Sequence, residues 1–140
     1  MPLTEPDSIS ARDPISVLVS GRPIVVSEKL TLRGVAAVLA GADIGAALVE
    51  REDGTAGIVS ERDVTRALAD DADPDLVWSA DVMTRDLVTA EADESILQVA
   101  LRMIEQGIRH IGVVERGQIT GVVSARDVFA VLAEEVLERP

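Results

Sequence analysis

The sequence predicts an α+β protein built from two similar units, each with the element order β-α-β-β-α. Two observations carry this prediction. The first is an internal repeat: residues 57–69 return as residues 121–133, with eight of thirteen positions identical at a spacing of 64. The second is the order of short apolar runs and helical periodicities, which is the same in both copies. One copy of about sixty residues buries too little surface to be stable alone, so we expect the two to pack sheet against sheet about a pseudo-twofold axis.

Each copy begins with a strand and a helix. Short β-branched runs at residues 24–26 and 87–89 follow turn-forming residues and predict brief strands. Apolar residues at the i, i+3, i+4, i+7 spacing then predict a helix with one buried face in each copy. They are Leu32, Val35, Ala36 and Leu39 in the first copy, and Ile96, Val99, Ala100 and Met103 in the second. Gly41 and Gly107 are expected to end these helices.

Two strands and a second helix complete each copy. The strands are predicted at residues 46–50 and 56–59 in the first copy, and at residues 110–114 and 118–123 in the second. Asp53-Gly54 and Arg116-Gly117 between them favour tight hairpin turns. The closing helices are predicted over residues 61–69 and 125–138. Helices that cover one face of each small sheet are typical of an α+β sandwich.

The composition argues against several classes of function. The 140 residues include 25 acidic and 13 basic side chains, giving a formal net charge of -12, which repels nucleic acid and anionic lipid. Trp78 and Phe129 are the only aromatic residues, too few for stacking on single-stranded nucleic acid. The chain has no cysteine and a single histidine, His110, which excludes disulfides, thiolate metal sites and histidine-rich metal centres. We therefore expect no metal and no cofactor.

The repeat divides the chain into four segments. They are an N-terminal extension over residues 1–16, a first repeat over 17–70, an acidic linker over 71–78 and a second repeat over 79–137. The N-terminal residues lack a basic segment followed by an apolar one, and no apolar stretch approaches the ~20 residues that cross a membrane. We therefore expect a cytoplasmic protein that does not contact membranes.

The acidic linker has one feature of a calcium loop. Asp71-x-Asp73-x-Asp75 matches the start of such a loop, but Leu76 stands where the loop needs glycine and Val82 where it needs glutamate. A solvated linker is therefore expected instead of a metal site. Trp78 is expected to pack this linker onto the body of the protein.

A serine and an aspartate stand at the start of the closing helix in each copy, Ser60 with Asp63 and Ser124 with Asp127. One explanation is helix capping, in which the two side chains satisfy free backbone N–H groups. The other is a ligand site, because each copy adds a glycine three residues before the serine and an arginine just before the aspartate. Glycine lets a ligand approach the backbone, a helix N-terminus with an arginine binds phosphate, and an aspartate can bind both hydroxyls of a ribose. Both explanations remain open.

Three sequence features together indicate a family. They are the duplicated motif Gly-h-h-Ser-x-Arg-Asp, where h is hydrophobic, the segment Ile-Arg-His-Ile-Gly-Val-Val at residues 108–114, and Asp-Val-Met-Thr at residues 81–84. With them the chain resembles a tandem pair of cystathionine β-synthase (CBS) domains, or Bateman module, over about residues 17–135. The resemblance implies binding of AMP, ADP, ATP or S-adenosylmethionine in clefts between the paired units, without chemistry on the ligand. It also implies that the aspartate holds the ribose and that the serine lies near the phosphates.

The resemblance implies two candidate ligand sites, one for each copy. The second site comprises Leu87, Val88, Arg109, His110, Ser124, Arg126 and Asp127. The first site comprises Ile24, Val25, Ala46, Ser60, Arg62 and Asp63. We expect the second site to bind more strongly, because Arg109 and His110 stand where the first copy has Gly45 and Ala46. The alternative for this pair is an ordinary strand, with one side chain in solvent and the other in the core.

The resulting hypothesis is a regulatory sensor. An adenine nucleotide or S-adenosylmethionine bridges the two repeats, shifts their packing and alters contacts with an unknown effector protein. The alternative is a ligand-free homodimerisation scaffold. A homodimer is expected in either case, through an apolar stripe on the helices that carry Leu32, Val35, Leu39, Ile96, Val99 and Met103. An enzyme is not expected and no catalytic residue is assigned, because one histidine and no cysteine supply neither a metal site nor an activated nucleophile.

Overall fold

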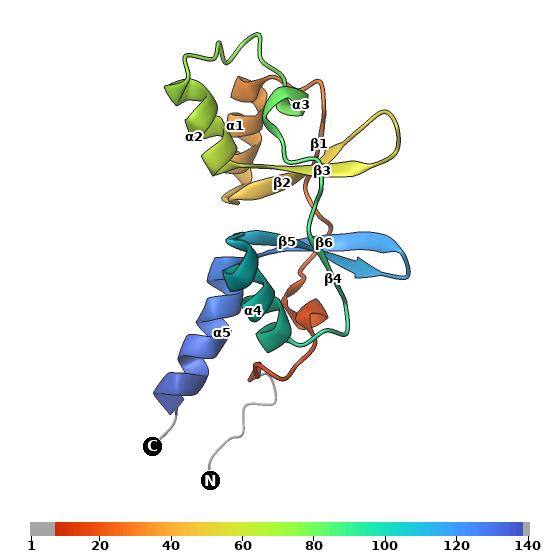
Figure 1. Cartoon of the computed structure of the whole chain (residues 1–140), viewed down its shortest axis with the longest axis vertical. Helices are drawn as coiled ribbons and strands as arrows, with labels where there is room; N and C mark the ends of the chain where they lie inside the picture. Colours follow the sequence, from red (N-terminus) through yellow and green to blue (C-terminus); the bar gives the residue numbers. More distant parts are fainter. Residues whose placement is uncertain (1–7, 139–140) are drawn as a thin grey trace. The chain divides into compact units, whose positions relative to one another are not determined.

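A computed structural model describes residues 8–138 of the chain. This part of the protein forms two compact units: residues 22–88 form one, and residues up to 21 join residues from 89 onward in the other. Figure 1 shows each unit as a small sheet with helices against one of its faces. The predicted α+β class with a duplicated unit is confirmed. The packing of one sheet against the other stays a prediction.

The unit of residues 22–88 contains a sheet with the strand order β1-β2-β3. Its strands are β1 (Val25–Ser27), β2 (Ala46–Glu50) and β3 (Ala56–Ser60), and its helices are α1 (Leu32–Ala42), α2 (Glu61–Ala69) and α3 (Ser79–Val82). β1 and β2 run parallel because α1 crosses between them, whereas β2 and β3 run antiparallel because a short hairpin joins them. This topology brings the start of β1, the start of β2 and the end of β3 to one end of the sheet.

Aliphatic side chains form the core between the helices and the sheet of this unit. Val35 and Leu39 of α1 pack with Val49 of β2 and Val59 of β3, and all four are buried. The helical spacing in the sequence therefore identified three buried residues of α1 correctly, Leu32, Val35 and Leu39, whereas the fourth, Ala36, is half-buried. Thr31 starts this helix as its N-cap, because its side chain accepts a hydrogen bond from a backbone N–H of the first turn.

The second unit repeats the same topology. Its elements are the 3₁₀ helix η1 (Ile15–Leu18), β4 (Thr89–Glu91), α4 (Ile96–Gln106), β5 (His110–Glu115), β6 (Gln118–Ser124) and α5 (Ala125–Glu138). The sheet has the order β4-β5-β6, with β4 parallel to β5 and β5 antiparallel to β6. α4 buries the four predicted residues Ile96, Val99, Ala100 and Met103. The sequence repeat is thus a repeat of one supersecondary unit.

Some element ends differ from the prediction. α1 runs through Gly41 to Ala42, because the following Asp43 takes the left-handed conformation (φ 53°) that ends the helix. Gly107 does end α4, with φ 64°, as predicted. β1 begins one residue later than predicted and β4 two residues later. The short helices η1 and α3 were not predicted, because four residues are too few to show a helical period.

The linker between the repeats is fastened to the unit of residues 22–88. The N–H of Leu32 donates to the carbonyl oxygen of Val77 at 2.8 Å, and the buried hydroxyl of Ser79 donates to that of Ser27 at 2.7 Å. The linker aspartates are exposed, as expected for a solvated segment. Trp78 is 45% exposed. We expected a buried indole to hold the linker, but backbone hydrogen bonds hold it instead.

The N-terminal segment is fastened to the other unit. Ile15 is fully buried, and its N–H donates to the carbonyl oxygen of Glu94 at 2.7 Å. The N–H of Ala11 donates to the carboxylate of Glu135 on α5 at 2.6 Å. Residues 1–7 of the predicted N-terminal extension lie outside the described residues. The segment before the first repeat thus completes the unit of the second repeat, and the linker completes the unit of the first.

Candidate functional site

In each unit the candidate serine, aspartate and arginine gather where the last strand passes into a helix. Ser60 is the last residue of β3 and the N-cap of α2, and it pairs with Ala46 at the start of β2. Ser124 likewise ends β6 and pairs with His110 at the start of β5. A strand start, a strand end and a helix N-terminus therefore meet at one point in each unit. Such a point offers backbone N–H donors together with side chains from three chain segments.

A capping box occupies the first of these junctions. The N–H of Ser60 donates to Asp63 Oδ2 at 2.8 Å, and the N–H of Asp63 donates to Ser60 Oγ at 3.3 Å. The hydroxyl of Ser60 also donates to Asp63 Oδ2, at 3.0 Å. These bonds use one carboxylate oxygen and leave Asp63 Oδ1 outside the box. A carboxylate can accept more bonds than these, so capping does not exhaust its capacity.

The second junction has the same two backbone bonds, with a longer one to the aspartate carboxylate. The N–H of Ser124 donates to Asp127 Oδ2 at 3.4 Å, and the N–H of Asp127 donates to Ser124 Oγ at 3.2 Å. Asp127 is exposed, whereas Asp63 is half-buried. The capping explanation therefore describes both copies of the motif. The second copy leaves its aspartate more accessible to a ligand.

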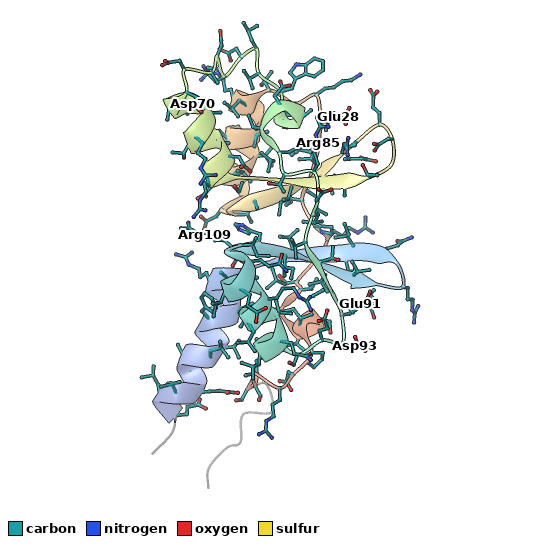
Figure 2. All side chains as sticks on the ribbon, viewed as in Figure 1. Glu28, Asp70, Arg85, Glu91, Asp93 and Arg109 are labelled. Atoms are coloured by element: carbon teal, nitrogen blue, oxygen red, sulfur yellow. The ribbon has the colours of Figure 1, made fainter. Side chains whose placement is uncertain are left out.

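Basic side chains surround the second junction. The N–H of Ala125 donates to the carbonyl oxygen of Arg109 at 2.6 Å, which holds the strand beside the first turn of α5. Figure 2 places Arg109 at this end of the sheet, and both Arg109 and Arg126 are exposed. His110 is half-buried. The junction thus brings together five of the seven residues predicted for the second site.

The remaining two residues of the second site, Leu87 and Val88, belong to the other compact unit. They directly precede β4 and are the last residues of the unit 22–88. The structure therefore does not bring them together with the residues around α5 in one unit. Their assignment to the second site stays a prediction.

All six residues predicted for the first site belong to one unit. Val25 pairs with Leu48 in parallel register, and the carbonyl oxygen of Ile24 accepts a hydrogen bond from the N–H of Leu48 at 3.0 Å. Ile24 and Val25 are exposed apolar residues at the sheet end that also carries the Ser60 junction. Ala46 is buried and pairs with Ser60 in the sheet. The site has one arginine, Arg62, which is exposed.

The site arginines are not committed to ion pairs within residues 8–138. In this part of the chain, ion pairs with carboxylates are formed by Lys29, Arg33, Arg51 and Arg102. Hydrogen bonding to the paired carboxylate, foremost, raises the pKa of Arg33 and of Arg102 above the usual range. Arg62, Arg109 and Arg126 form none of these ion pairs, and their side chains are exposed. They are therefore the basic side chains of the two junctions that can meet an anionic ligand.

The motif glycines have a structural role that the sequence did not reveal. A Cβ atom on Gly57 would lie 2.8 Å from the carbonyl oxygen of Thr84 and 3.0 Å from the sulfur of Met83. A Cβ atom on Gly121 would lie 2.6 Å from a methyl carbon of Val19. The segments that complete the two units cross the sheets at these glycines. Close approach of a chain segment, where we had expected approach of a ligand, accounts for both glycines.

Two features of residues 8–138 bear on other functions. No group of three or more acidic or histidine side chains within residues 8–138 is placed to hold a metal ion. Among the helices of the same part of the chain, none combines the length and apolar character needed to span a bilayer.

The curated relatives that match this chain include two proteins described as uncharacterized. One, from Methanocaldococcus jannaschii, is 34% identical over 91 residues, which are 65% of this chain and 32% of that protein. The other, from Methanopyrus kandleri, is 26% identical over 125 residues, which are 88% of this chain and 60% of that protein. The chain therefore spans about a third and three fifths of the lengths of these relatives.

Solved structures and a family model agree with the fold. A CBS domain protein from Pyrobaculum aerophilum complexed with AMP is 30% identical, with a TM-score of 0.77 over 89% of this chain and 98% of that chain. The CBS domain pair of another protein, in complex with 5′-methylthioadenosine and S-adenosyl-L-methionine, is 25% identical, with a TM-score of 0.75 over 85% of this chain and 98% of that chain. The model of the CBS domain matches residues 9–70 and 79–134. The chain belongs to the CBS domain family and carries a tandem pair of these domains.

Proposed function

We propose that this chain is a non-enzymatic regulatory module that binds an adenosyl ligand at its strand–helix junctions. One observation carries the proposal: the fold assembles the same serine, aspartate, arginine and helix N-terminus twice, at equivalent ends of two sheets. A capping box alone requires neither the arginine nor the duplication. The structures complexed with AMP and with S-adenosyl-L-methionine support the choice of ligand class.

The second junction is proposed as the stronger site. Asp127 Oδ1 accepts hydrogen bonds from ribose hydroxyls while Oδ2 retains the capping bond from Ser124. Arg109 and Arg126 pair with the phosphate, and the first N–H groups of α5 add hydrogen-bond donors. The first junction has Arg62 alone in these positions. Its binding is therefore expected to be weaker.

Regulation follows from differential binding. A ligand shifts a conformational equilibrium only as far as it binds one state more tightly than the other. The proposed ligand stabilises one conformation of the module, and an effector protein recognises that conformation. We propose a homodimer in the cytoplasm as the binding form, with no part in nucleic-acid or membrane recognition because of the net charge of -12.

A ligand-free homodimerisation scaffold is the second candidate. The capping boxes favour it, because they give Ser60, Asp63, Ser124 and Asp127 hydrogen-bond partners within the chain itself. In this case the motif serves only the helix starts. The two candidates differ in one measurable property, the presence of a specific adenosyl ligand.

A thermal-shift experiment separates the two candidates. The purified protein is heated with AMP, ADP, ATP, S-adenosylmethionine, NAD or GTP, each over a range of concentrations. A ligand of the folded state at a hundred times its Kd stabilises the protein by about 2.7 kcal/mol, a clear rise in Tm. We expect at least one adenosyl compound to raise the Tm and GTP to leave it unchanged. Equal Tm values throughout would contradict the sensor and favour the scaffold.

A further inference from the structure

The linker between the repeats carries exposed apolar side chains. Leu76 is 75% exposed, more than any other large apolar residue of the unit 22–88, and Trp78, the only tryptophan of the chain, is exposed too. The helix residues from which we expected an apolar stripe are instead buried in the cores of their own units: Leu32, Val35, Leu39, Ile96, Val99 and Met103. In this unit, exposed apolar side chains outside the candidate first site are therefore found at the linker and at the adjoining Leu68 of α2.

The N-terminal segment makes the same backbone contacts in the other unit as the linker makes in its own. Trp78 of the linker forms an antiparallel bridge with Thr31, and Pro14 of the N-terminal segment forms one with Ser95. The members of the two bridges differ by 64 residues, which is the spacing of the repeat. In both segments the next N–H donates to the carbonyl oxygen just before the bridged residue, at 2.8 Å in the linker and 2.7 Å in the N-terminal segment. The two segments are therefore equivalent parts of the repeated unit.

This equivalence shows that the fold does not require the two exposed apolar residues of the linker. The N-terminal segment has Arg12 where the linker has Leu76, and Pro14 where it has Trp78. Arg12 and Pro14 are both exposed. The same backbone contacts thus form without a large apolar side chain at either position. A leucine and an indole that are left in solvent without a structural role indicate an interaction site.

Negative charge is concentrated beside these two side chains. Asp70, Asp71, Asp73 and Asp75 are all exposed, and Figure 2 shows Asp70 where α2 passes into the linker. Asp75 forms an ion pair with Arg33 at 2.6 Å, whereas the other three form none within residues 8–138. We call Leu76, Trp78 and these four aspartates the linker patch. Its charge favours a basic partner and repels an acidic one.

Arginine is the basic side chain that best fits the linker patch. Its planar guanidinium stacks on an indole and also pairs with a carboxylate through two hydrogen bonds. An apolar residue beside the arginine can cover Leu76. Nucleic acid, anionic lipid or a second copy of this chain would meet the repulsion of a net charge of -12. No two basic residues are adjacent among the 140 residues, so the chain itself supplies no such segment.

We propose that the linker patch binds an arginine-rich segment of an effector protein, with apolar residues between the arginines. The inference rests on the effector of the proposed function, gives its chemical class, and uses none of the nucleotide-site residues. The linker is fixed to both helices, because the N–H of Leu32 donates to Val77 at 2.8 Å and the N–H of Ala72 donates to Ala67 of α2 at 2.9 Å. A surface held in this way loses little conformational entropy when a partner binds.

The first test uses the fluorescence of Trp78. Because the chain has a single tryptophan, its emission reports directly on the linker patch. The protein is titrated, at physiological ionic strength, with a synthetic peptide of alternating arginine and leucine. The emission is expected to shift to shorter wavelength as the indole leaves water, whereas a peptide of alternating glutamate and leucine is expected to leave it unchanged. An emission maximum that the arginine peptide does not move would overturn the proposal.

The second test separates the linker patch from attraction by net charge. The Kd of the fluorescein-labelled arginine peptide is measured by anisotropy. D71N/D73N is expected to raise this Kd by about tenfold, and asparagine suits both positions, since it tolerates the left-handed backbone of Asp71 (φ 63°) and can still accept the N–H of Asp75 at position 73. D93N/E115Q is the matched control, because it removes two exposed charges from the second repeat. Equal Kd values for the two double variants would mean that the peptide responds to net charge alone, and the proposal would be wrong.

The third test removes the apolar part of the linker patch. Leu76→Arg introduces the residue of the equivalent N-terminal position, and Trp78→Ser removes the indole. Each is expected to raise the Kd of the labelled peptide by about tenfold with unchanged circular dichroism. Leu137→Ser, an exposed change on α5, is the control and is expected to bind as the wild type does. Wild-type affinity in both linker variants contradicts the proposal.

The outcome for the linker patch is distinguishable from that for the nucleotide sites. A protein that binds the arginine peptide at the linker patch but binds no adenosyl compound would overturn the nucleotide proposal and leave this one intact. A protein that binds an adenosyl compound but not the peptide would overturn this proposal alone.

Discussion

Asp63 and Asp127 stabilise the fold before any ligand arrives, because each carboxylate accepts the N–H of the serine that starts its helix. The same bond orients the carboxylate at the junction of strand and helix. Preorganisation of this kind reduces the entropy lost when a ligand binds. Capping and ligand binding are therefore compatible uses of one side chain, and substitutions must separate them.

Asp127→Ala is expected to abolish the stronger AMP-binding event in calorimetry, because it removes the proposed ribose acceptor. It also removes a capping partner, at a cost of about 0.5–2 kcal/mol in stability. Asp127→Asn is the matched variant, since an amide oxygen still accepts the capping bond but the negative charge is gone. Loss of binding in both variants, with stability retained in Asp127→Asn, supports a ligand role. If Asp63→Ala abolishes the stronger event and Asp127→Ala does not, the ranking of the two sites is wrong.

Gly57→Ala is expected to destabilise the protein by about 1–3 kcal/mol, because its Cβ would press on the backbone oxygen of Thr84, which cannot move as a side chain can. Gly41→Ala is the control: it lies inside α1 with open space around the added carbon, and alanine there should stabilise by about 0.5–1 kcal/mol. Urea unfolding of the three proteins checks both signs. A neutral Gly57→Ala variant would show that the crossing segment is loosely packed.

At the scale of elements, the start of the second repeat is tied together by one ion pair. Glu94, in the turn before α4, accepts the N–H of Glu91 at 2.7 Å and forms an ion pair with Arg102 of α4. Arg102 also donates to the carbonyl oxygen of Thr89 at 3.0 Å, so its side chain links β4 to α4. The equivalent positions of the first repeat are Leu30 and Val38, which pack as apolar residues. The two repeats thus fix the same β-α turn by different means.

This ion pair predicts a pH dependence. Hydrogen bonding from Arg102, foremost, holds the pKa of Glu94 below its ordinary value. A lowered folded-state pKa contributes stability above the unfolded value and loses it as the pH falls through the folded value. Glu94→Gln is therefore expected to destabilise the protein at pH 7 and to have a smaller effect below about pH 4. Urea unfolding at both pH values is the measurement, with the exposed Glu115→Gln as control; an equal loss at both would mean that the charge of Glu94 does not matter.

At the scale of the molecule, the sequence predicted features that depend on residues near in the chain and missed contacts between distant segments. Helical spacing located the buried faces of α1 and α4, and the repeat predicted both sheets, because these patterns are set by residues near in sequence. The backbone hydrogen bond between Ile15 and Glu94 joins residues far apart in the chain, and no local sequence pattern predicts it. The junction residues of the candidate sites could be named from the duplicated motif. The exposure of Leu97, Leu101 and Ile104 on α4 was not predicted, because the sequence does not show which surface of a helix the sheet leaves uncovered.

The net charge of the molecule makes the response of AMP binding to salt informative. A chain with a net charge of -12 repels an anionic nucleotide at long range, so affinity must come from arginines and helix N-termini at the junctions. Salt screens the long-range repulsion first, since the Debye length is about 8 Å at physiological ionic strength, whereas hydrogen-bonded contacts within a site are screened less. We therefore expect the Kd for AMP, measured by calorimetry across a sodium chloride series, to stay within about twofold or to improve between low and physiological salt. Adenosine, which lacks the phosphate, is the uncharged control and should show no salt dependence. A steep, monotonic loss of AMP affinity with salt would indicate diffuse pairing with surface arginines and would contradict a site built at the strand–helix junction.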